Sequence, residues 1–361
     1  MKILHIVEDF SVKSGGLRTV IKNLDFYLKK LGHDSFILAS DKEKNDDIFV
    51  VKTSNKWLYS KEWKKKIIEI TNKKNIDIIH IHGAWLYPQY VSSKVAFHKK
   101  IPIVLSLHGM FQPWLWKKGR LKKKIYFYLL SKKYFSNAAI IHTITTEETK
   151  TIRGFFKRNK LVEIPNLISF EEQKEDNKKI EKNILYLGRL NKTKGIDILI
   201  KAFSKIDNKE VHLQIAGGIN SYQKELEELI ESLKLKEKVT FLGEVKGEQK
   251  IKLIKNAWVM ASPTYSDVIG MVNLEAASLK TPMITTFNTG LKPEWNLNGG
   301  KLIYPNVDEL LESFNEVLKW SLEERNAQGV LLYNYVKNEY SWEKKLKDWE
   351  LLYKKAIVNE K

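Results

Sequence analysis

Two carboxylates, Asp267 and Glu275, stand close together in the segment SPTYSDVIGMVNLEAASLKT, residues 262–281. The apolar run before it, KNAWVMA, suits a buried strand, and residues 271–279 have a helical composition, so a loop runs into a helix here. A carboxylate accepts two hydroxyl hydrogen bonds at once, and paired carboxylates in a cleft commonly bind diols such as those of ribose or another sugar. Two solvated surface acids are the alternative interpretation.

The same part of the chain has features of an anion site. Gly270 allows close approach of the backbone to a ligand, and the N–H groups that follow it, with the positive end of the helix dipole, can hold a phosphate. Arg189 follows a strand and Lys194 begins a helix, with few acidic residues near either in the sequence. Arginine binds phosphate bidentately and lysine binds it as a point charge, so this pair predicts a diphosphate site.

Histidines end two strands in the first half of the chain. His80 and His82 close the strand at 76–82, and His108 closes the strand at 101–108. His80 and His82 face the same side of a sheet because they are two residues apart, but a metal site needs a third ligand and none is near in sequence. His108 stands at the carboxyl end of its strand, where doubly wound sheets bind ligands. A structural histidine is the alternative there.

Strands and helices alternate in two cycles around these residues. The first cycle has a strand at 2–7, a loop with Gly15 and Gly16, a helix to residue 31 and a strand at 35–40. The second has strands at 183–187, 211–216, 239–242 and 258–261, with helices at 194–203, 222–233 and 249–256. This order predicts an α/β protein with two Rossmann-like, doubly wound parallel-sheet domains. The predicted boundaries are 1–168, a polar linker at 169–182, 183–340, and a final amphipathic helix at 341–361.

Length and composition limit the class of protein. A chain of 361 residues is long enough for about two domains. It has no cysteine, which excludes disulfides and thiolate chemistry and suits a reducing cytosol. The first strand is too short for a signal peptide, and no apolar run approaches the roughly 20 residues of a membrane span. We therefore expect a cytoplasmic protein, soluble or at a membrane surface.

The positive charge is concentrated in one part of the chain. The formal net charge is +19, and residues 51–165 hold 24 Lys and Arg against 6 Asp and Glu, whereas the rest holds 38 against 37. Such a surplus indicates a polyanionic partner, either a phospholipid surface, a lipid pyrophosphate or a nucleic acid. Residues 110–135 alternate aromatic and basic side chains, which suits an anionic bilayer or a nucleic acid. A helix with a core-facing aromatic stripe is the alternative.

The ordered set of motifs resembles the retaining nucleotide-sugar glycosyltransferases of family 4, which have the GT-B fold. The resemblance covers nearly the whole chain: Gly15-Gly16, DIIHIHG, LHG, IPN at 164–166, GRLNKTKG at 188–195, the segment from Asp267 to Glu275, and YSWEKKLKDWELLYKK near the end. It implies two Rossmann-like domains that face each other across a cleft. It also implies that the final helix, 341–361, crosses back to the first domain.

The resemblance implies a role for each motif. Arg189 and Lys194 should bind the diphosphate of a UDP- or GDP-linked sugar donor, with Gly15 and Gly16 closing over it. Glu275 should bind the ribose hydroxyls.

The sugar is assigned to other residues. Asp267 should contact its hydroxyls, with the backbone N–H groups of Gly270 and Met271, and His108 should lie beside the reacting sugar. The family usually has glutamate at position 267, followed by Gly-Phe-Gly, and a glycine where Leu167 stands. Aspartate is one methylene shorter than glutamate, so its reach changes, and this puts sugar preference or activity in question.

The implied reaction is retaining, metal-independent sugar transfer, with same-face attack by the acceptor hydroxyl and the departing phosphate as base. The charge distribution favours a glycan or polyprenyl-pyrophosphate-linked acceptor at the cytoplasmic face of a membrane, in bacterial surface polysaccharide or glycoconjugate synthesis. A UDP-hexosamine epimerase and a non-catalytic sugar-nucleotide-binding subunit share the architecture and stay as alternatives. The acidic pair argues against a nucleic-acid partner.

Overall fold

The computed structural model describes residues 1–44, 46–53, 55–117, 119–170, 180, 182–208 and 210–358. The chain divides into two compact units, residues 1–166 with 345–361 (unit 1) and residues 167–344 (unit 2). The expected linker at 169–182 lies outside the described residues except at 169, 170, 180 and 182, as do the last three residues of the expected final helix. No helix among the described residues is long and apolar enough to cross a membrane.

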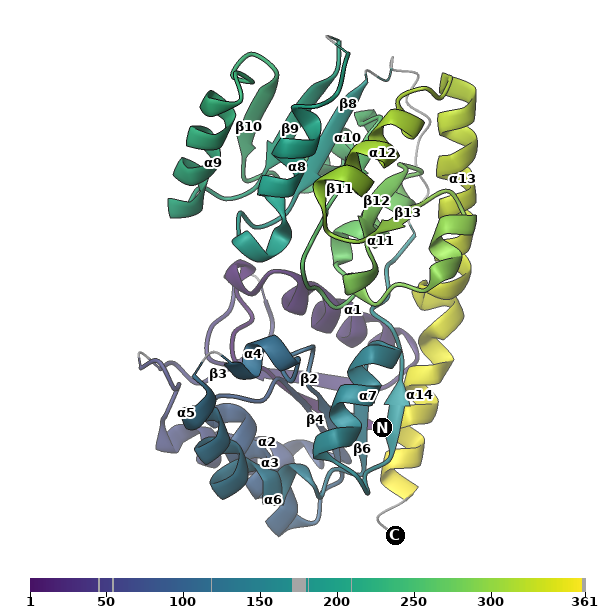
Figure 1. Cartoon of the computed structure of the whole chain (residues 1–361). Coiled ribbons are helices and arrows are strands. Elements are labelled where there is room, and N and C mark those ends of the chain that lie inside the picture. Colours follow the sequence, from purple (N-terminus) through teal and green to yellow (C-terminus); the bar gives the residue numbers. More distant parts are fainter. Residues whose placement is uncertain are drawn as a thin grey trace. The chain divides into compact units, whose positions relative to one another are not determined.

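Unit 1 is built on a parallel sheet of seven strands, in the order β3-β2-β1-β4-β5-β6-β7 (Figure 1). The strands are β1 (Lys2–Ile6), β2 (Asp34–Ala39), β3 (Phe49–Val50), β4 (Ile78–His82), β5 (Ile103–Ser106), β6 (Ile140–Thr143) and β7 (Leu161–Glu163). The helical segments are η1 (Val12–Ser14), α1 (Gly16–Lys30), α2 (Lys61–Lys74), α3 (Tyr87–Lys99), α4 (Pro113–Lys117), α5 (Arg120–Ile125), η2 (Tyr126–Ser131), α6 (Lys132–Phe135), α7 (Thr146–Phe155) and α14 (Trp342–Val358), which belongs to unit 1 from residue 345 on.

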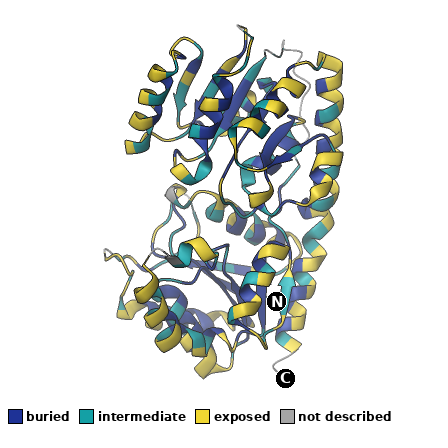
Figure 2. Cartoon of the chain, in the orientation of Figure 1, coloured by how far each residue is buried: buried dark blue, intermediate teal, exposed yellow. Residues whose placement is uncertain are grey.

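The two faces of this sheet differ in polarity because successive strand residues point to opposite sides. Leu4, Ile79 and Leu105 belong to a fully buried apolar cluster that includes Trp63 of α2. The other face holds buried polar side chains as well as apolar ones, with His5 as the polar example on β1. Apart from Lys2, the residues of β1, β4 and β5 are buried, and Figure 2 shows them in dark blue. Unit 1 therefore contains a buried polar layer as well as an apolar core.

Unit 2 has a second parallel sheet, of six strands, in the order β10-β9-β8-β11-β12-β13. The strands are β8 (Asn183–Leu187), β9 (His212–Ala216), β10 (Val239–Gly243), β11 (Val259–Ala261), β12 (Met283–Thr286) and β13 (Lys301–Ile303). The helical segments are η3 (Lys192–Lys194), α8 (Ile196–Phe203), α9 (Ser221–Ser232), α10 (Gly247–Asn256), α11 (Met271–Ser278), η4 (Phe287–Thr289), η5 (Pro293–Leu297), α12 (Val307–Val317) and α13 (Leu322–Glu339).

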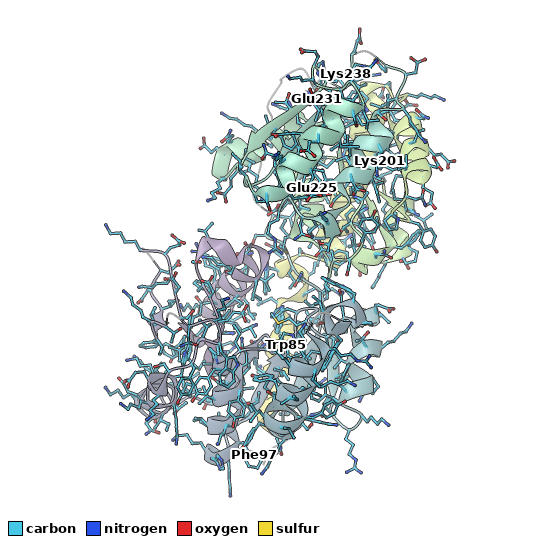
Figure 3. The ribbon with its side chains drawn as sticks, turned by 60° about the vertical axis from the view of Figure 1, so that its left-hand side comes forward. Trp85, Phe97, Lys201, Glu225, Glu231 and Lys238 are labelled. Atoms are coloured by element: carbon cyan, nitrogen blue, oxygen red, sulfur yellow. The ribbon has the colours of Figure 1, made fainter. Side chains whose placement is uncertain are left out.

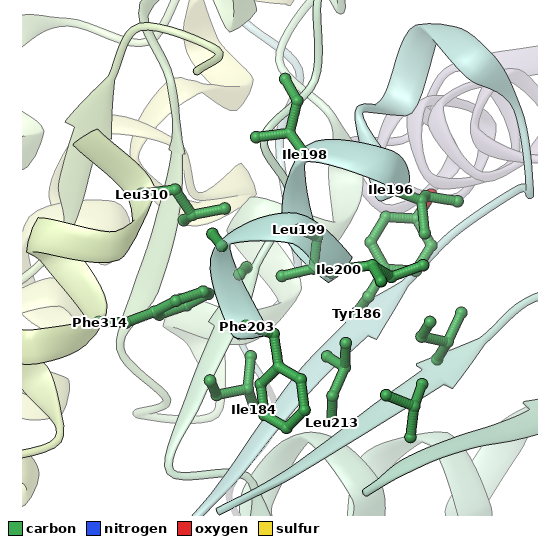
Figure 4. Packing of buried hydrophobic residues seen from close by; sticks show 14 of the residues in the cluster. Ile184, Tyr186, Ile196, Ile198, Leu199, Ile200, Phe203, Leu213, Leu310 and Phe314 are labelled. Atoms are coloured by element: carbon green, nitrogen blue, oxygen red, sulfur yellow. The ribbon is translucent and has the colours of Figure 1, made fainter. Parts of the chain in front are cut away.

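The core of unit 2 lies between the sheet and α8. Leu199 and Phe203 of α8 pack with Leu213 of β9 and Phe314 of α12, all almost fully buried (Figure 4). The outer sides of α8 and α9 are charged, as Lys201 of α8 and Glu225 of α9 show (Figure 3). This amphipathic pattern is what a helix needs to cover a sheet in water.

The two parallel α/β sheets confirm the predicted fold class. The predicted strands and helices are present within a few residues of their expected ends. Five short strands, β3, β6, β7, β12 and β13, were not predicted. They have two to four residues each, which is too short for an alternating or apolar run to be distinguished from a loop.

Candidate active site

In unit 2 the loops that follow β8 and β11 pack against each other. Gly195, between η3 and α8, has a φ of +67°, and a Cβ atom there would lie 2.0 Å from the carbonyl oxygen of Pro263. The hydroxyl of Thr264 donates a hydrogen bond to the carbonyl oxygen of Thr193 at 2.9 Å. Only glycine fits position 195, and it lets the segment that carries Lys194 lie against the segment that leads to Asp267.

Lys194 and Asp267 form an ion pair. The Lys194 Nζ lies 2.5 Å from Asp267 Oδ2, and the two side chains are 18% and 26% exposed. Asp267 also packs against Gly270, where a Cβ atom would lie 2.7 Å from Oδ2. Lys194, which was assigned to the phosphates, and Asp267, which was assigned to the sugar, are therefore in contact within unit 2. Few acidic residues are near Lys194 in the sequence, but the fold brings it a carboxylate partner from 73 residues away.

Arg189 lies close to this pair. The Tyr186 hydroxyl donates to the carbonyl oxygen of Arg189 at 2.9 Å. Burial raises the pKa of Tyr186, the charge of Asp267 raises it further, and the charge of Arg189 opposes the rise. Both charged groups are thus near the Tyr186 hydroxyl. The Arg189 side chain is exposed and makes no ion pair within the described residues, so its guanidinium is available to an anion.

Glu275 is paired with a lysine that sequence reasoning missed. Glu275 Oε1 lies 2.7 Å from Nζ of Lys250, on α10, and the side chains are 22% and 28% exposed. Lys250 is one of several lysines in a lysine-rich helix, and no spacing or composition signal distinguishes it from the others. Glu275 is the fifth residue of α11, which places it about 6 Å along the helix axis from Met271.

The start of α11 offers backbone donors beside these charges. Gly270 caps the helix, and its carbonyl oxygen accepts from the N–H of Asn273 at 2.9 Å. The N–H groups of Met271 and Val272 make no hydrogen bond within the described residues. The carboxyl-end edge of the unit 2 sheet thus combines three cations, two carboxylates and free N–H donors.

In unit 1, His108 occupies a strained position after β5. Its φ is +48° and that of Gly109 is +74°, two successive left-handed residues. The turn is held by Glu148 of α7, whose carboxylate accepts from the N–H groups of Gly109 at 2.6 Å and Ile144 at 2.7 Å. Burial raises the pKa of Glu148, and these two hydrogen bonds oppose the rise. The turn directs the His108 ring inward, where its Nε2 lies 2.9 Å from Nδ1 of His82.

His82 belongs to a cluster of buried histidines on the polar face of the unit 1 sheet. His5, His80 and His82 have ligand atoms within 4.8 Å of one another, so the structure brings His5 to the pair that appeared in sequence to lack a third ligand. Both nitrogens of His80 are nevertheless engaged, with the Tyr353 hydroxyl and the Ser106 hydroxyl at 2.7 Å each.

Both nitrogens of His82 are engaged as well. His82 Nε2 lies 3.0 Å from His5 Nδ1, and His82 Nδ1 lies 2.9 Å from His108 Nε2. The rings of His80 and His82 have centroids 3.9 Å apart, with their planes tilted by 35°. The trio is better described as hydrogen-bonded rings than as a metal centre.

Gly15 and Gly16 form the turn between η1 and α1. Gly15 has a φ of +61° and open space around its Cα, and Gly16 is the first residue of α1. Arg18 holds the preceding loop, because its guanidinium pairs with both oxygens of Asp46 at 2.8 and 2.9 Å and donates to the carbonyl oxygen of Phe10 at 2.8 Å. The glycine pair therefore sits on an anchored loop at the carboxyl end of β1.

The aromatic and basic segment at 110–135 separates into two parts. Its aromatic residues largely enter the core, as Phe111 and Phe127 do at 1% and 0% exposure. This matches the core-facing stripe that sequence analysis left as the alternative. A different set is exposed on α5 and η2. Leu121 and Ile125 are four residues apart, and the adjacent Tyr128 and Leu129 follow Ile125 by three and four: the four side chains are 71%, 50%, 52% and 76% exposed in chain order.

Comparisons with known proteins agree with this architecture. The family model of glycosyl transferases group 1 matches residues 168–329, and that of Glycosyltransferase Family 4 matches residues 14–172. An uncharacterized glycosyltransferase of Methanocaldococcus jannaschii is 34% identical over 49% of this chain and 46% of its own length. The gpi3 subunit of phosphatidylinositol N-acetylglucosaminyltransferase of Schizosaccharomyces pombe is 25% identical over 76% of this chain and 60% of its own.

A solved structure extends the likeness over both units. The Anabaena protein HepE, in complex with UDP and glucose, has a TM-score of 0.77 with 17% identity, covering 98% of this chain and 99% of that one. The matched part of each of the two curated relatives is less than two thirds of its length. Structural likeness at this identity establishes the fold.

Proposed function

Because the chain belongs to the family 4 glycosyltransferases with the GT-B fold, we propose that it transfers a sugar from a nucleoside-diphosphate donor, with retention of configuration. The observation that carries this proposal is the edge of unit 2, where Lys194 meets Asp267 and Lys250 meets Glu275. Such pairs hold two carboxylates and two cations in place before a ligand arrives. A bound sugar nucleotide would supply both kinds of side chain with new hydrogen-bond partners. Its phosphate oxygens would accept from the cations, and its hydroxyls would donate to the carboxylates.

Each residue has a defined task in this reaction. Arg189 and Lys194 neutralise the diphosphate as it leaves, which we propose makes a metal ion unnecessary. Asp267 accepts hydrogen bonds from the sugar, and Glu275 accepts those of the ribose. The acceptor oxygen forms its bond to the anomeric carbon as the bond to phosphate breaks, and the acceptor proton passes to the departing phosphate. Aspartate at position 267 is one methylene shorter than glutamate, so the accepted sugar hydroxyl must lie closer to the backbone.

Charge removal tests the diphosphate site. Arg189→Ala and Lys194→Ala should each lower turnover at least about tenfold, since a hydrogen bond to a charged group contributes roughly 1.5–3 kcal/mol. Lys192→Ala is the matched control, because Lys192 is in the same short helix but pairs with Glu225 at 2.6 Å. The donor is first identified by thermal shift with UDP-, GDP- and ADP-sugars. Unchanged kinetics in both charge variants would remove the assignment.

Product analysis separates this function from its alternatives. A transferase extends an acceptor glycan and releases nucleoside diphosphate only as fast as the glycan grows. A hexosamine epimerase would release free sugar without an acceptor. A non-catalytic subunit would bind the donor, with the thermal shift intact, and produce neither product.

We further propose that the acceptor is a lipid-linked glycan and that unit 1 binds the cytoplasmic face of a membrane. The exposed residues of α5 and η2, Leu121, Ile125, Tyr128 and Leu129, recur at helical spacing, and we infer from this spacing that they form one apolar strip. Basic residues surround the strip, among them Lys132, whose Nζ lies 4.8 Å from the centre of the Tyr128 ring. An apolar strip with a cationic border fits the headgroup region of an anionic bilayer, where each nearby lysine contributes about 1 kcal/mol. The relative from Schizosaccharomyces pombe is named for a phosphatidylinositol substrate, which supports a lipid-linked acceptor.

Vesicle co-sedimentation tests the membrane surface. The wild-type protein should sediment with vesicles that contain phosphatidylserine more than with phosphatidylcholine vesicles at physiological salt. Leu129→Glu should weaken this binding, because it places a like charge in the strip that meets the acyl chains. Leu297→Glu is the matched control, since Leu297 is 81% exposed in unit 2, away from α5 and η2 in the sequence. Equal binding of both variants would refute the assigned surface.

A further inference from the structure

Three imidazole rings run in series from the interior of unit 1 to His108. His5 Nδ1 lies 3.0 Å from His82 Nε2, and His82 Nδ1 lies 2.9 Å from His108 Nε2. Burial lowers the pKa of His5 to about 4 and that of His108 to about 3, and it lowers the pKa of His82 well below its ordinary value. The three rings are therefore neutral at physiological pH, and each carries one N–H.

The hydrogen bonds that link these three neutral rings can be donated in either of two directions. In one, His5 Nδ1–H donates to His82, and His82 Nδ1–H donates to Nε2 of His108. In the other, every donation is reversed, and His5 Nε2 carries the remaining proton. His5 is fully buried, and its Nε2 has no hydrogen-bond partner among the described residues. A buried N–H without an acceptor is rarer than an acceptor without a donor, so the first direction is favoured.

A second series of hydrogen bonds lies on the same face of the sheet. A backbone carbonyl group at its end determines which atom donates in each bond. His142 Nε2 lies 2.8 Å from the carbonyl oxygen of Ile164, so this nitrogen must be the one that carries the proton. His142 Nδ1 then accepts from the Ser106 hydroxyl at 2.7 Å, and Ser106 accepts from Nε2–H of His80 at 2.7 Å. His80 Nδ1 in turn accepts from the Tyr353 hydroxyl. His80 thus has the tautomer opposite to the one inferred for His82, its neighbour on β4.

We propose that His5 and His82 are positioning residues that hold His108 as its Nδ1–H tautomer, so that the ring presents an N–H donor to an oxygen of the bound sugar. The geometry carries this inference, because His108 Nε2 is occupied by His82 and Nδ1 makes no hydrogen bond within the described residues. That the acceptor of this N–H is a sugar oxygen rests on the proposed function. A ring held in this way orients a sugar oxygen and does not take the acceptor proton, which agrees with the departing phosphate as base.

Nitrogen-15 NMR of the whole protein, labelled at histidine, tests the tautomers directly. Two-bond couplings from the ring carbon protons distinguish Nδ1–H from Nε2–H, and single-histidine variants assign the signals. We expect Nδ1–H for His5, His82 and His108, and Nε2–H for His80 and His142. The second pair serves as the internal control. An Nε2–H signal from His108 would overturn the inference, whatever the enzyme does.

Substitution of His82 tests the consequence for turnover. His82→Leu should lower kcat about tenfold or more with little change in nucleotide affinity, and His82→Gln should retain most activity, because an amide can accept from His5 and donate to His108. His80→Leu is the matched control: it removes an equally buried ring from the same strand but should keep the His108 tautomer and kcat. If His82 had only a structural role, His80→Leu and His82→Leu would have equal kcat values.

The outcomes separate this inference from the proposed function. If wild-type protein transfers no sugar from any donor, the proposed function fails and the NMR signals still decide the tautomers. If wild-type protein is active but His82→Leu keeps full kcat, the positioning role fails alone. If His82→Leu does not fold, the wild-type NMR signals and His82→Gln decide.

Discussion

Acidification should unfold unit 1 before unit 2. Burial lowers the pKa of His5 and of His142 to about 4, whereas in the unfolded chain each is near the ordinary 6.5. Between pH 6.5 and 4, the unfolded chain therefore binds protons at these imidazole rings, whereas the rings of the native state stay neutral. The stability from these neutral rings is full above pH 6.5 and is lost as the pH falls from 6.5 towards 4.

The loss can be worked out for each ring. Between pH 7.5 and 5, a histidine with these two pKa values costs the native state about 2 kcal/mol, so the two rings together cost about 4 kcal/mol. Burial lowers the pKa of His80 and of His82 as well, and both add to the loss. A domain with 5–15 kcal/mol of stability is strongly weakened by this change.

Two buried carboxyl groups of unit 1 act in the opposite direction. Burial raises the pKa of Glu8 and of Glu148, so the native state protonates them more readily than the unfolded chain does. Their contribution to stability increases as the pH falls through their raised pKa values. The histidines outnumber them, so unit 1 should still lose stability on acidification. Unit 2 contains a single histidine, His212, which is exposed.

Hydrogen exchange read by mass spectrometry at pH 7.5 and 5, corrected for the intrinsic rate at each pH, measures the two units separately. Amides of β1 and β4 should lose protection at pH 5, while those of β8 and β9 should change little. His142→Gln removes one titrating ring, so it should lower stability at pH 7.5 but reduce the further loss at pH 5 by about 2 kcal/mol. A change in unit 1 below about 1 kcal/mol, or an equal change in both units, would refute the reasoning.

Two substitutions in unit 2 give further predictions. Gly195→Ala should destabilise the protein by more than about 1 kcal/mol and abolish donor binding, because its Cβ would lie 2.0 Å from the carbonyl oxygen of Pro263 at a positive φ; urea unfolding and donor titration measure both effects. Lys250→Met should leave folding stability within about 1 kcal/mol, since a partly exposed ion pair contributes little, but weaken donor affinity by about tenfold as Glu275 loses its partner. Calorimetric titration with the donor checks this, and unchanged affinity would exclude Lys250 from the site.

Much of the fold could be predicted from local pattern. The apolar strand that ends at His82 and the helix that begins near Lys194 are recognisable because burial on a sheet imposes a run of β-branched residues, and a helix imposes its own period. The aromatic residues at 110–135 show where pattern fails. Phe111 and Phe127 look the same in sequence as side chains that would enter a membrane, and only packing shows that they are buried.

The candidate site divides in the same way. The sequence alone was enough to select the charged residues of the site and the glycines beside them, because close backbone approach and charge each require particular residue types. The charged residues are Arg189, Lys194, Asp267 and Glu275. The sequence also determined two parallel α/β domains. Tertiary structure alone decided that Lys250 of α10 meets Glu275 of α11 and that His5 joins His82 and His108, since the packing of elements distant in sequence sets these contacts. A side chain acquires its partner, its pKa and its tautomer only when the sheet forms.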